Sequence, residues 1–216
     1  MGPSLNEPVA ATEPSSRGTE SHARESGSPW VSIAALGGAS AWDPKLDDYQ
    51  WSVGPSAAYG AQTLVGVGRW AGGVRLWRSR SSQQIDPNSS ATEATVHATS
   101  LELVGRARLA SRSRTALSLE LTGGWLRLSY APDHAQVATG SGTVDVEFRP
   151  VDTWVAGAGL AFEQSLAGAW SLGFGVNQRL FSLETAHRNG NSIELGREQF
   201  LDWSARLEVA KHWGWR

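Results

Sequence analysis

Three features that mark other classes of protein are missing from this 216-residue chain. It has no cysteine, which excludes a disulfide framework and cysteine-ligated metal sites. It has no run of about 18 consecutive apolar residues, so no membrane-spanning helix is predicted. The first 29 residues also lack the apolar segment of a secretory signal peptide. For an exported protein, we therefore expect the export signal to be encoded upstream of Met1.

Charge and histidine spacing exclude further classes of function. The chain has 19 Lys and Arg against 21 Asp and Glu, a net charge of −2, so no nucleic-acid partner is predicted. His22, His97 and His134 are isolated, and none has the paired spacing of a metal site. The glycines between Gly66 and Gly73 do not open a helix, which argues against a nucleotide-binding loop. We therefore expect no cofactor, no metal ion and no nucleic acid.

The chain is rich in glycine and tryptophan, with 24 and 11 residues, and its mean hydropathy is −0.29 although 40% of its residues are hydrophobic. The last run, Phe200–Trp215, shows the reason most clearly. Its odd positions are mostly bulky: Leu201, Trp203, Ala205, Leu207, Val209, Lys211, Trp213 and Trp215. Its even positions are mostly small or charged: Asp202, Ser204, Arg206, Glu208, Ala210, His212 and Gly214. A period of two predicts a β-strand, and the run is long enough to cross a bilayer.

Seven further runs alternate in a similar way. The predicted strands are Trp30–Trp42, Gln50–Tyr59, Thr63–Arg78, Thr99–Ala110, Thr115–Tyr130, Val151–Leu166, Trp170–Leu183 and Phe200–Trp215. Short turns and longer polar loops alternate between them, including loops over Ser79–Ala98, Ala131–Pro150 and Glu184–Gln199. In Thr115–Tyr130 the apolar parity shifts after Gly123-Gly124, which predicts a β-bulge.

These patterns predict an all-β fold, an eight-stranded antiparallel up-and-down transmembrane β-barrel with a disordered N-terminal tail. Residues 1–29 form the predicted tail, because they have almost no large apolar side chain, and residues 30–216 form the barrel. Short turns on one side and long loops on the other are typical of bacterial outer-membrane barrels, with both termini on the short-turn side.

Tryptophan positions predict two aromatic girdles at the two membrane surfaces. The short-turn girdle is expected to contain Trp30, Trp170, Trp213 and Trp215, and the long-loop girdle Trp42, Trp51, Trp77, Trp154 and Trp203. Trp70 and Trp125 fall in the middle of predicted strands and fit neither girdle.

The polar parity predicts what fills the lumen. Besides small residues it contains Arg69, Arg75, Glu102, Arg106, Arg108, Glu120, Glu163, Arg179, Asp202, Arg206 and Glu208. The interior of an eight-stranded barrel is just wide enough for side chains, and buried charges require partners. Six arginines against five acids therefore predict a packed ion-pair network rather than an open pore.

In this architecture the chain resembles the eight-stranded outer-membrane barrel proteins of the OmpA, OmpX and OmpW kind over Trp30–Arg216. Their last strand ends in an aromatic residue with alternating apolar residues before it, a pattern similar to Leu207, Val209, Trp213 and Trp215, from which Lys211 and Arg216 depart. The resemblance implies a bacterial outer-membrane location, contact with outer-membrane lipid, insertion by the barrel-insertion machinery through the last strand, and a monomer.

The predicted function is a structural or surface-interaction role of a non-enzymatic barrel, through long external loops whose partner the sequence does not name. Three alternatives remain open. The OmpW-like resemblance implies a narrow channel for small molecules, apolar ones included. A soluble lipocalin-like carrier would have eight strands with the faces inverted, apolar inside. A lipid A hydrolase would use Ser182, Glu184 and His187, which lie together after the seventh strand.

Overall fold

The computed structural model describes residues 27–85, 93–139, 142–189 and 192–214, and for residues 137–139, 186–189 and 192–194 it describes the backbone only. The predicted tail over residues 1–29 therefore lies almost entirely outside the described residues, and so do Trp215 and Arg216.

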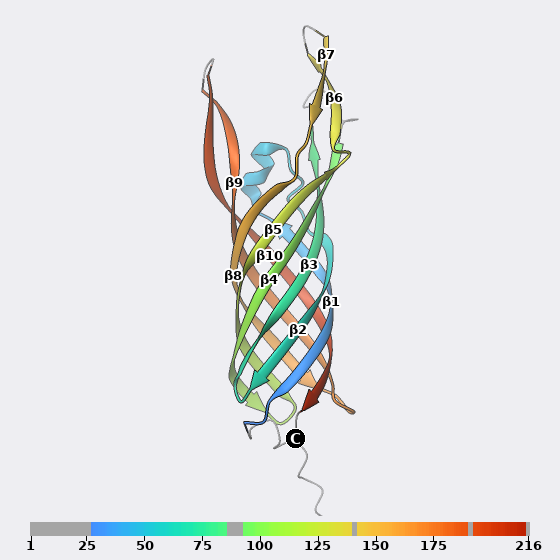
Figure 1. The fold of residues 1–216 in the computed structure, drawn as a ribbon, viewed down its shortest axis with the longest axis vertical. Helices are drawn as coiled ribbons and strands as arrows, with labels where there is room; N and C mark the ends of the chain where they lie inside the picture. The colour runs from blue at the N-terminus through green and yellow to red at the C-terminus, as the bar shows by residue number, and fades with distance from the viewer. Residues whose placement is uncertain (1–26, 86–92, 140–141, 190–191, 215–216) are drawn as a thin grey trace, which may run out of the picture.

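Eight strands close into one antiparallel barrel, which confirms the predicted fold class (Figure 1). They are β1 (Trp30–Trp42), β2 (Ser56–Val67), β3 (Trp70–Gln84), β4 (Glu93–Arg112), β5 (Thr115–Ala131), β8 (Val151–Ser165), β9 (Trp170–Asn189) and β10 (Ser192–Gly214). The order around the barrel is β1-β10-β9-β8-β5-β4-β3-β2. β6 (His134–Thr139) and β7 (Gly142–Glu147) form a separate hairpin, and a short 3-10 helix, η2 (Pro44–Tyr49), follows β1. In the described part of the chain, no helix is long and apolar enough to span a membrane.

The predicted direction of the side chains is confirmed along the barrel wall. Leu160, Phe174 and Leu207 point outward, with 50%, 47% and 57% of their surfaces exposed. Glu120 and Arg206 point into the lumen and are 0% and 2% exposed. A soluble carrier would have the opposite arrangement, so the lipocalin-like alternative is wrong. The outward face is a lipid-facing surface.

The turn between the second and third strands lies at Gly68 and Arg69, and the predicted turn around Gly60–Gln62 is wrong. β2 runs through these small residues without interruption and pairs with β3 from Ala58 to Val67. Gly68 has a φ of 59°, a left-handed conformation that glycine adopts at little cost. The second strand also begins later than predicted, at Ser56, directly after Pro55, which has no N–H for a ladder.

Three predicted polar loops consist largely of strand. The β3–β4 ladder continues to Gln84 opposite Glu93, and the β9–β10 ladder continues to Asn189 opposite Ser192. The β6–β7 hairpin occupies most of the predicted loop over Ala131–Pro150. These hairpins extend beyond the barrel body at one end, which we call the loop end; β10 ends at the opposite, short-turn end (Figure 1). Polar composition misled the prediction because hairpin strands in water carry polar side chains.

The predicted β-bulge at Gly123-Gly124 is absent. β5 pairs with β4 and with β8 in continuous register through these glycines, and the register shift lies between Arg108 and Ala110 of β4. The apolar side chains of β5 nevertheless change from the outer face to the lumen face along the strand. Leu121 faces outward and is 57% exposed, whereas Leu126 and Leu128 face the lumen and are 1% and 0% exposed.

Six of the tryptophans that the structure describes face outward, in two rings. The short-turn ring contains Trp70, Trp170 and Trp213, and the loop-end ring contains Trp125, Trp154 and Trp203. Trp203 and Trp213 lie ten positions apart on β10. At ~3.4 Å per residue and a tilt of ~40°, this spacing corresponds to roughly 25 Å, the height of the apolar band of an outer-membrane barrel.

The predicted girdles therefore need correction at six described positions: four tryptophans leave them and two join them. Trp42, Trp51 and Trp77 are 2%, 4% and 3% exposed and lie inside the barrel. Trp42 and Trp77 occupy inward-facing positions of β1 and β3, whereas Trp51 lies between η2 and β2 and forms an isolated bridge to Gln83. Trp30 also lies on the lumen side, where the centroid of its ring lies 5.7 Å from that of the His212 ring and the indole covers Gly66. Trp70, which fitted neither girdle, belongs to the short-turn ring because the turn precedes it directly. Trp125, which also fitted neither, belongs to the loop-end ring, where the centroid of its ring lies 5.3 Å from that of Trp154.

Candidate functional site

The middle of the lumen holds four arginines and four carboxylates, which we call the ionic cluster. Its members come from five strands, and each is at most 9% exposed: Arg75, Glu102, Arg106, Glu120, Arg179, Asp202, Arg206 and Glu208. All eight were predicted to face the lumen, and equal numbers of the two charges leave the cluster without a formal net charge.

Ion pairs join the cluster from one side of the lumen to the other. The Arg179 guanidinium contacts the Asp202 carboxylate on one side and Glu102 Oε1, at 2.7 Å from Nη1, on the other. Glu102 Oε2 lies 3.7 Å from Arg75 Nη1, and Arg75 Nη2 lies 2.7 Å from Glu120 Oε1. Arg75 also donates from Nε to Gln62 Oε1, at 3.0 Å.

Glu120 is the branch point of the cluster. Its Oε2 accepts from Arg106 Nε at 2.8 Å and from Arg206 Nη2 at 2.6 Å. Both arginines then donate to Oε1 of Glu208, at 2.6 and 2.8 Å. Buried charges are stable when paired and hydrogen-bonded, and each carboxylate here meets at least one guanidinium.

A lumen-facing glycine makes room for the cluster. Gly175 lies directly opposite Arg206 in the β9–β10 ladder. A Cβ atom at this position would lie 2.7 Å from Arg206 Cζ, closer than real Cβ contacts come. The abundance of glycine in the chain thus partly reflects the volume of arginine side chains inside a narrow barrel.

Three predicted members lie outside the ionic cluster. Arg69 lies in the β2–β3 turn, with its Cζ atom 5.2 Å from the centre of the Trp70 ring, because the turn is later than predicted. Arg108 and Glu163 are half-buried near the short turns, where they line a small cavity with Arg106. Glu163 Oε1 instead lies 3.3 Å from His212 Nε2.

His212 is a lumen residue that sequence reasoning did not single out, although it occupies an even position of the last strand. Its Nε2 also lies 2.7 Å from Ser171 Oγ, so a serine, a histidine and a carboxylate meet near the short turns. A catalytic triad places the serine and the carboxylate on different ring nitrogens. Both groups contact Nε2 here, which gives a structural contact rather than a proton relay.

An apolar core fills the lumen above the ionic cluster, at the loop end. Its buried members are Trp42, Leu46, Trp51, Val96, Ala98, Leu126, Leu128, Val155, Phe181, Leu183 and Phe200. Leu46 comes from η2, which folds over the loop end of the barrel. The Leu46 side chain is 1% exposed there. The Asp43 side chain accepts from Lys45 N at 3.0 Å and from Leu201 N at 2.8 Å, which ties η2 to β10.

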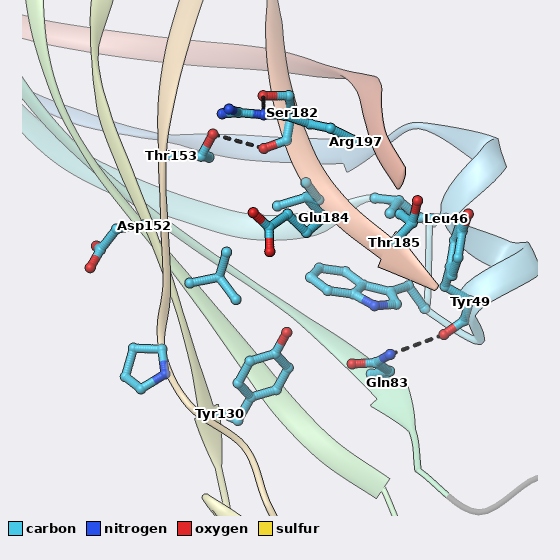
Figure 2. Close-up of a pocket in the computed structure, with 14 residues that line it drawn as sticks. Leu46, Tyr49, Gln83, Tyr130, Asp152, Thr153, Ser182, Glu184, Thr185 and Arg197 are labelled. Atoms are coloured by element: carbon cyan, nitrogen blue, oxygen red, sulfur yellow. Dashed lines mark hydrogen bonds between the residues drawn. The ribbon is translucent and has the colours of Figure 1, made fainter. Parts of the chain in front are cut away.

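The barrel wall opens at the loop end between β8 and β9. Their ladder ends at Val155 opposite Phe181, although β8 begins at Val151 and β9 continues to Asn189. A cavity of about 730 Å³ occupies this opening, which we call the side cleft (Figure 2). Its lining residues are Leu46, Tyr49, Trp51, Gln83, Tyr130, Pro150, Val151, Asp152, Thr153, Ser182, Leu183, Glu184, Thr185 and Arg197. Within the opening, beyond the end of the ladder, a hydrogen bond runs from Thr153 Oγ1 of β8 to Ser182 O of β9 at 2.7 Å.

The residues of the hydrolase hypothesis lie at the side cleft. Ser182 and Glu184 line it, while the His187 side chain lies outside the described residues. Ser182 Oγ accepts a hydrogen bond from Arg197 Nε at 2.9 Å, so its described partner is a cation and not a base (Figure 2). Among the described residues, no three His, Cys, Asp or Glu side chains are arranged to hold a metal ion.

Comparison with known proteins gives matches in structure alone. No protein-family model and no curated protein matches the chain. The structure of outer membrane protein AlkL in DMPC lipid bilayers is 13% identical, with a TM-score of 0.50 and 98% of each chain covered. Neisserial surface protein A is 9% identical, with a TM-score of 0.45 and 85% of this chain and 96% of that chain covered. The N-terminal β-barrel domain of Pseudomonas aeruginosa OprF is 12% identical, with a TM-score of 0.36 and 87% and 99% covered.

At 13% identity the likeness to AlkL concerns architecture alone, and it agrees with the closed ring of strands. Over Trp30–Gly214, the chain has the fold of the eight-stranded outer-membrane β-barrel proteins.

Proposed function

We propose that this protein is a non-enzymatic, integral outer-membrane barrel that carries no solute and acts by binding molecules at its loop end. The observation that carries the proposal is the filled lumen. The ionic cluster occupies its middle, and the apolar core, covered by Leu46, occupies its loop end. Ion conduction needs a continuous water-filled path, whereas two packed layers in series leave the loop end as the surface for function.

Single-channel recording in planar bilayers tests the sealed lumen. We expect no sustained current from the wild-type protein. A widened variant, with Phe181→Ala and Phe200→Ala in the apolar core and Arg206→Ser and Glu208→Ser in the ionic cluster, should conduct. The last two substitutions remove one charge of each sign, so the cluster stays neutral. Heat-dependent mobility on denaturing gels checks that both proteins are folded barrels. A steady wild-type current contradicts the proposal and favours the transport function.

The absence of hydrolase activity is part of the same proposal. Ser182 receives a hydrogen bond from Arg197, an arrangement that does not raise the nucleophilicity of the hydroxyl. Incubation with lipid A should give the same product profile for the wild type, Ser182→Ala and His187→Ala. A product that disappears in either variant contradicts the non-enzymatic role.

Closure of the sheet supports a monomer that contacts outer-membrane lipid. Each of the eight barrel strands has a neighbour on both sides, so the barrel body has no free edge for a second copy. We propose insertion by the barrel-insertion machinery through β10, whose outward residues alternate as an insertion signal requires. Light scattering in detergent, corrected for bound detergent, should give the mass of one chain.

A further inference from the structure

The inner wall of the side cleft is apolar and aromatic. Trp51 is 4% exposed, and Tyr49 and Tyr130 are half-buried beside it. Leu46 and Leu183 complete the wall. Figure 2 shows the Tyr130 ring and the Glu184 carboxylate on opposite sides of the same space. This wall suits an apolar or aromatic body, and aromatic faces attract cations.

The rim of the side cleft carries more negative than positive charge. Asp152 and Glu184 line it, and Arg197, opposite Glu184 in the β9–β10 ladder, is the one cation among the lining residues. The Asp152 carboxylate also lies 3.9 Å from Arg127 Nη1 and accepts a hydrogen bond from Trp125 Nε1 at 3.0 Å, so Glu184, Glu198 and Asp48 supply the surplus of negative charge. The Arg197 guanidinium already donates to Ser182, whereas Glu184 is exposed and forms no ion pair with another described side chain. Just behind the wall, Glu198 Oε2 accepts a hydrogen bond from the Tyr49 hydroxyl at 3.2 Å.

The charged groups around Tyr49 are also negative, like those at the rim of the side cleft. Burial, together with the carboxylates of Glu198 and Asp48, raises the pKa of the Tyr49 phenol. The cleft thus combines aromatic walls with a surplus of carboxylates, and this combination favours a positively charged ligand over an anion.

The position of the cleft gives such a ligand access. The split between β8 and β9 leaves an opening in the wall, and Trp154 of the loop-end ring lies on its β8 edge, at the membrane surface. A volume of about 730 Å³ lies within the range of small-molecule sites, which runs from roughly 300 to 1,000 Å³. An amphiphilic molecule concentrates at such a surface and needs no path through the lumen.

We propose that the side cleft binds a small organic cation, a molecule with an ammonium head and an apolar or aromatic body. The head lies between Glu184 and Asp152, and the body lies against Trp51 and Tyr130. This inference rests on the proposed loop-end binding function and deepens it by naming the chemical class of the ligand. It requires no conduction through the barrel.

Calorimetric titration of the full chain in lipid nanodiscs tests the inference, with benzyltriethylammonium as the probe and benzenesulfonate as the anionic counterpart. The cation should bind and the sulfonate should not. In the Asp152→Asn, Glu184→Gln variant the affinity for the cation should fall about tenfold, the effect of two charges at ~6 Å near water. Arg197→Gln should raise it about threefold, and Asp145→Asn, a neutralised exposed acid on β7, should leave it unchanged.

The acid variant should weaken binding of the cation and Arg197→Gln should strengthen it. These opposite effects separate ligand binding from damage to the fold, because a misfolded variant does not gain affinity. Tyr130→Leu should also weaken binding of the ammonium while leaving the barrel folded. Equal binding of the sulfonate, no binding of the cation by the wild type, or no response to the charge variants overturns the inference. A conducting wild type that still binds the cation overturns the sealed lumen alone, and a silent barrel without affinity for the cation overturns the side cleft alone.

Discussion

The two halves of the barrel interior have opposite chemistry, and so do the surfaces around them. On the short-turn side of the loop-end ring, the arginines and carboxylates of the ionic cluster lie in the lumen beside a small apolar group that includes Leu36 and Trp77, and leucines face outward. Beyond the ring, leucines, phenylalanines and tryptophans fill the lumen, and charged residues such as Arg78 and Arg80 face outward. Along the same strands, the barrel thus changes from an apolar exterior around a charged interior to a charged exterior around an apolar interior, as in a water-soluble protein.

β5 shows both patterns within one strand and without a change of register. Leu119 and Leu121 face outward on the membrane side, and Leu126 and Leu128 face inward beyond it. The pleat continues unbroken, so the leucines change parity because the medium outside the wall changes. Lipid accepts apolar side chains on the exterior, whereas water drives them into the lumen.

The difference predicts how each layer responds to the loss of a side chain. The largest effect is expected in the ionic cluster. Arg179→Ala leaves the buried carboxylates of Asp202 and Glu102 without this cation, and should lower the free energy of unfolding by about 3–5 kcal/mol. Urea unfolding in lipid vesicles measures the change. The exposed Arg80→Ala is the matched control, expected within about 0.5 kcal/mol of the wild type. Equal losses in both variants contradict the paired, buried cluster.

The apolar core should respond through cavity formation. Leu128 is fully buried at the loop end, so Leu128→Ala should cost about 3 kcal/mol in the same unfolding experiment. Leu195 on β10 is 81% exposed, and Leu195→Ala should change the free energy of unfolding by less than about 0.5 kcal/mol. If Leu128→Ala proves as mild as its control, the loop-end lumen is not packed.

Glycine substitution tests the space around the cluster. Gly175→Ala places a methyl group against the Arg206 guanidinium and should destabilise the barrel by roughly 1–3 kcal/mol. Gly37 faces outward on β1, and a Cβ atom added there would have no neighbouring atom within 4 Å, so Gly37→Ala should be nearly neutral. A neutral Gly175→Ala shows that Arg206 can move aside, which weakens the argument for a tightly packed cluster.

The smallest effect is expected for an ion pair in water. His134 Nδ1 lies 2.8 Å from Asp133 Oδ1 beside the β6–β7 hairpin, and this hydrogen bond raises the pKa of His134. The pair therefore contributes in full below the ordinary pKa of histidine, and the contribution is lost as the pH rises through the raised pKa. Asp133→Asn should bring the pKa of His134, followed by NMR titration, back toward its ordinary value. The unfolding curve should not move, because exposed pairs stabilise little. A clear loss of stability contradicts the contrast with the lumen.

Tryptophan shows how far one residue type can be interpreted from the sequence. Abundant Trp near strand ends predicted aromatic girdles, and Trp154, Trp170, Trp203 and Trp213 do face outward. Trp42 fills the loop-end lumen instead. Period-two alternation gives the face of a residue relative to its neighbours, but it does not give the medium that each face meets.

The side cleft is a site that could not be predicted from the sequence. Its lining comes from η2, β3, β5, β8, β9 and β10, and only closure of the barrel brings these segments together. Ser182 and Glu184 stood out in the sequence because they are close in the chain. Tyr49, Trp51 and Tyr130 had no such signal, since nothing local places them beside β9.

The all-β class, the eight crossings and eight of the eleven predicted lumen charges could be predicted from the sequence, because the alternation of side chains along a strand is a local property of the backbone. Three features are known only from the folded barrel: which arginine meets which carboxylate, where the interior changes from charged to apolar, and where the wall opens. These depend on the register between strands and on the medium outside them, and neither is a property of any single stretch of the chain.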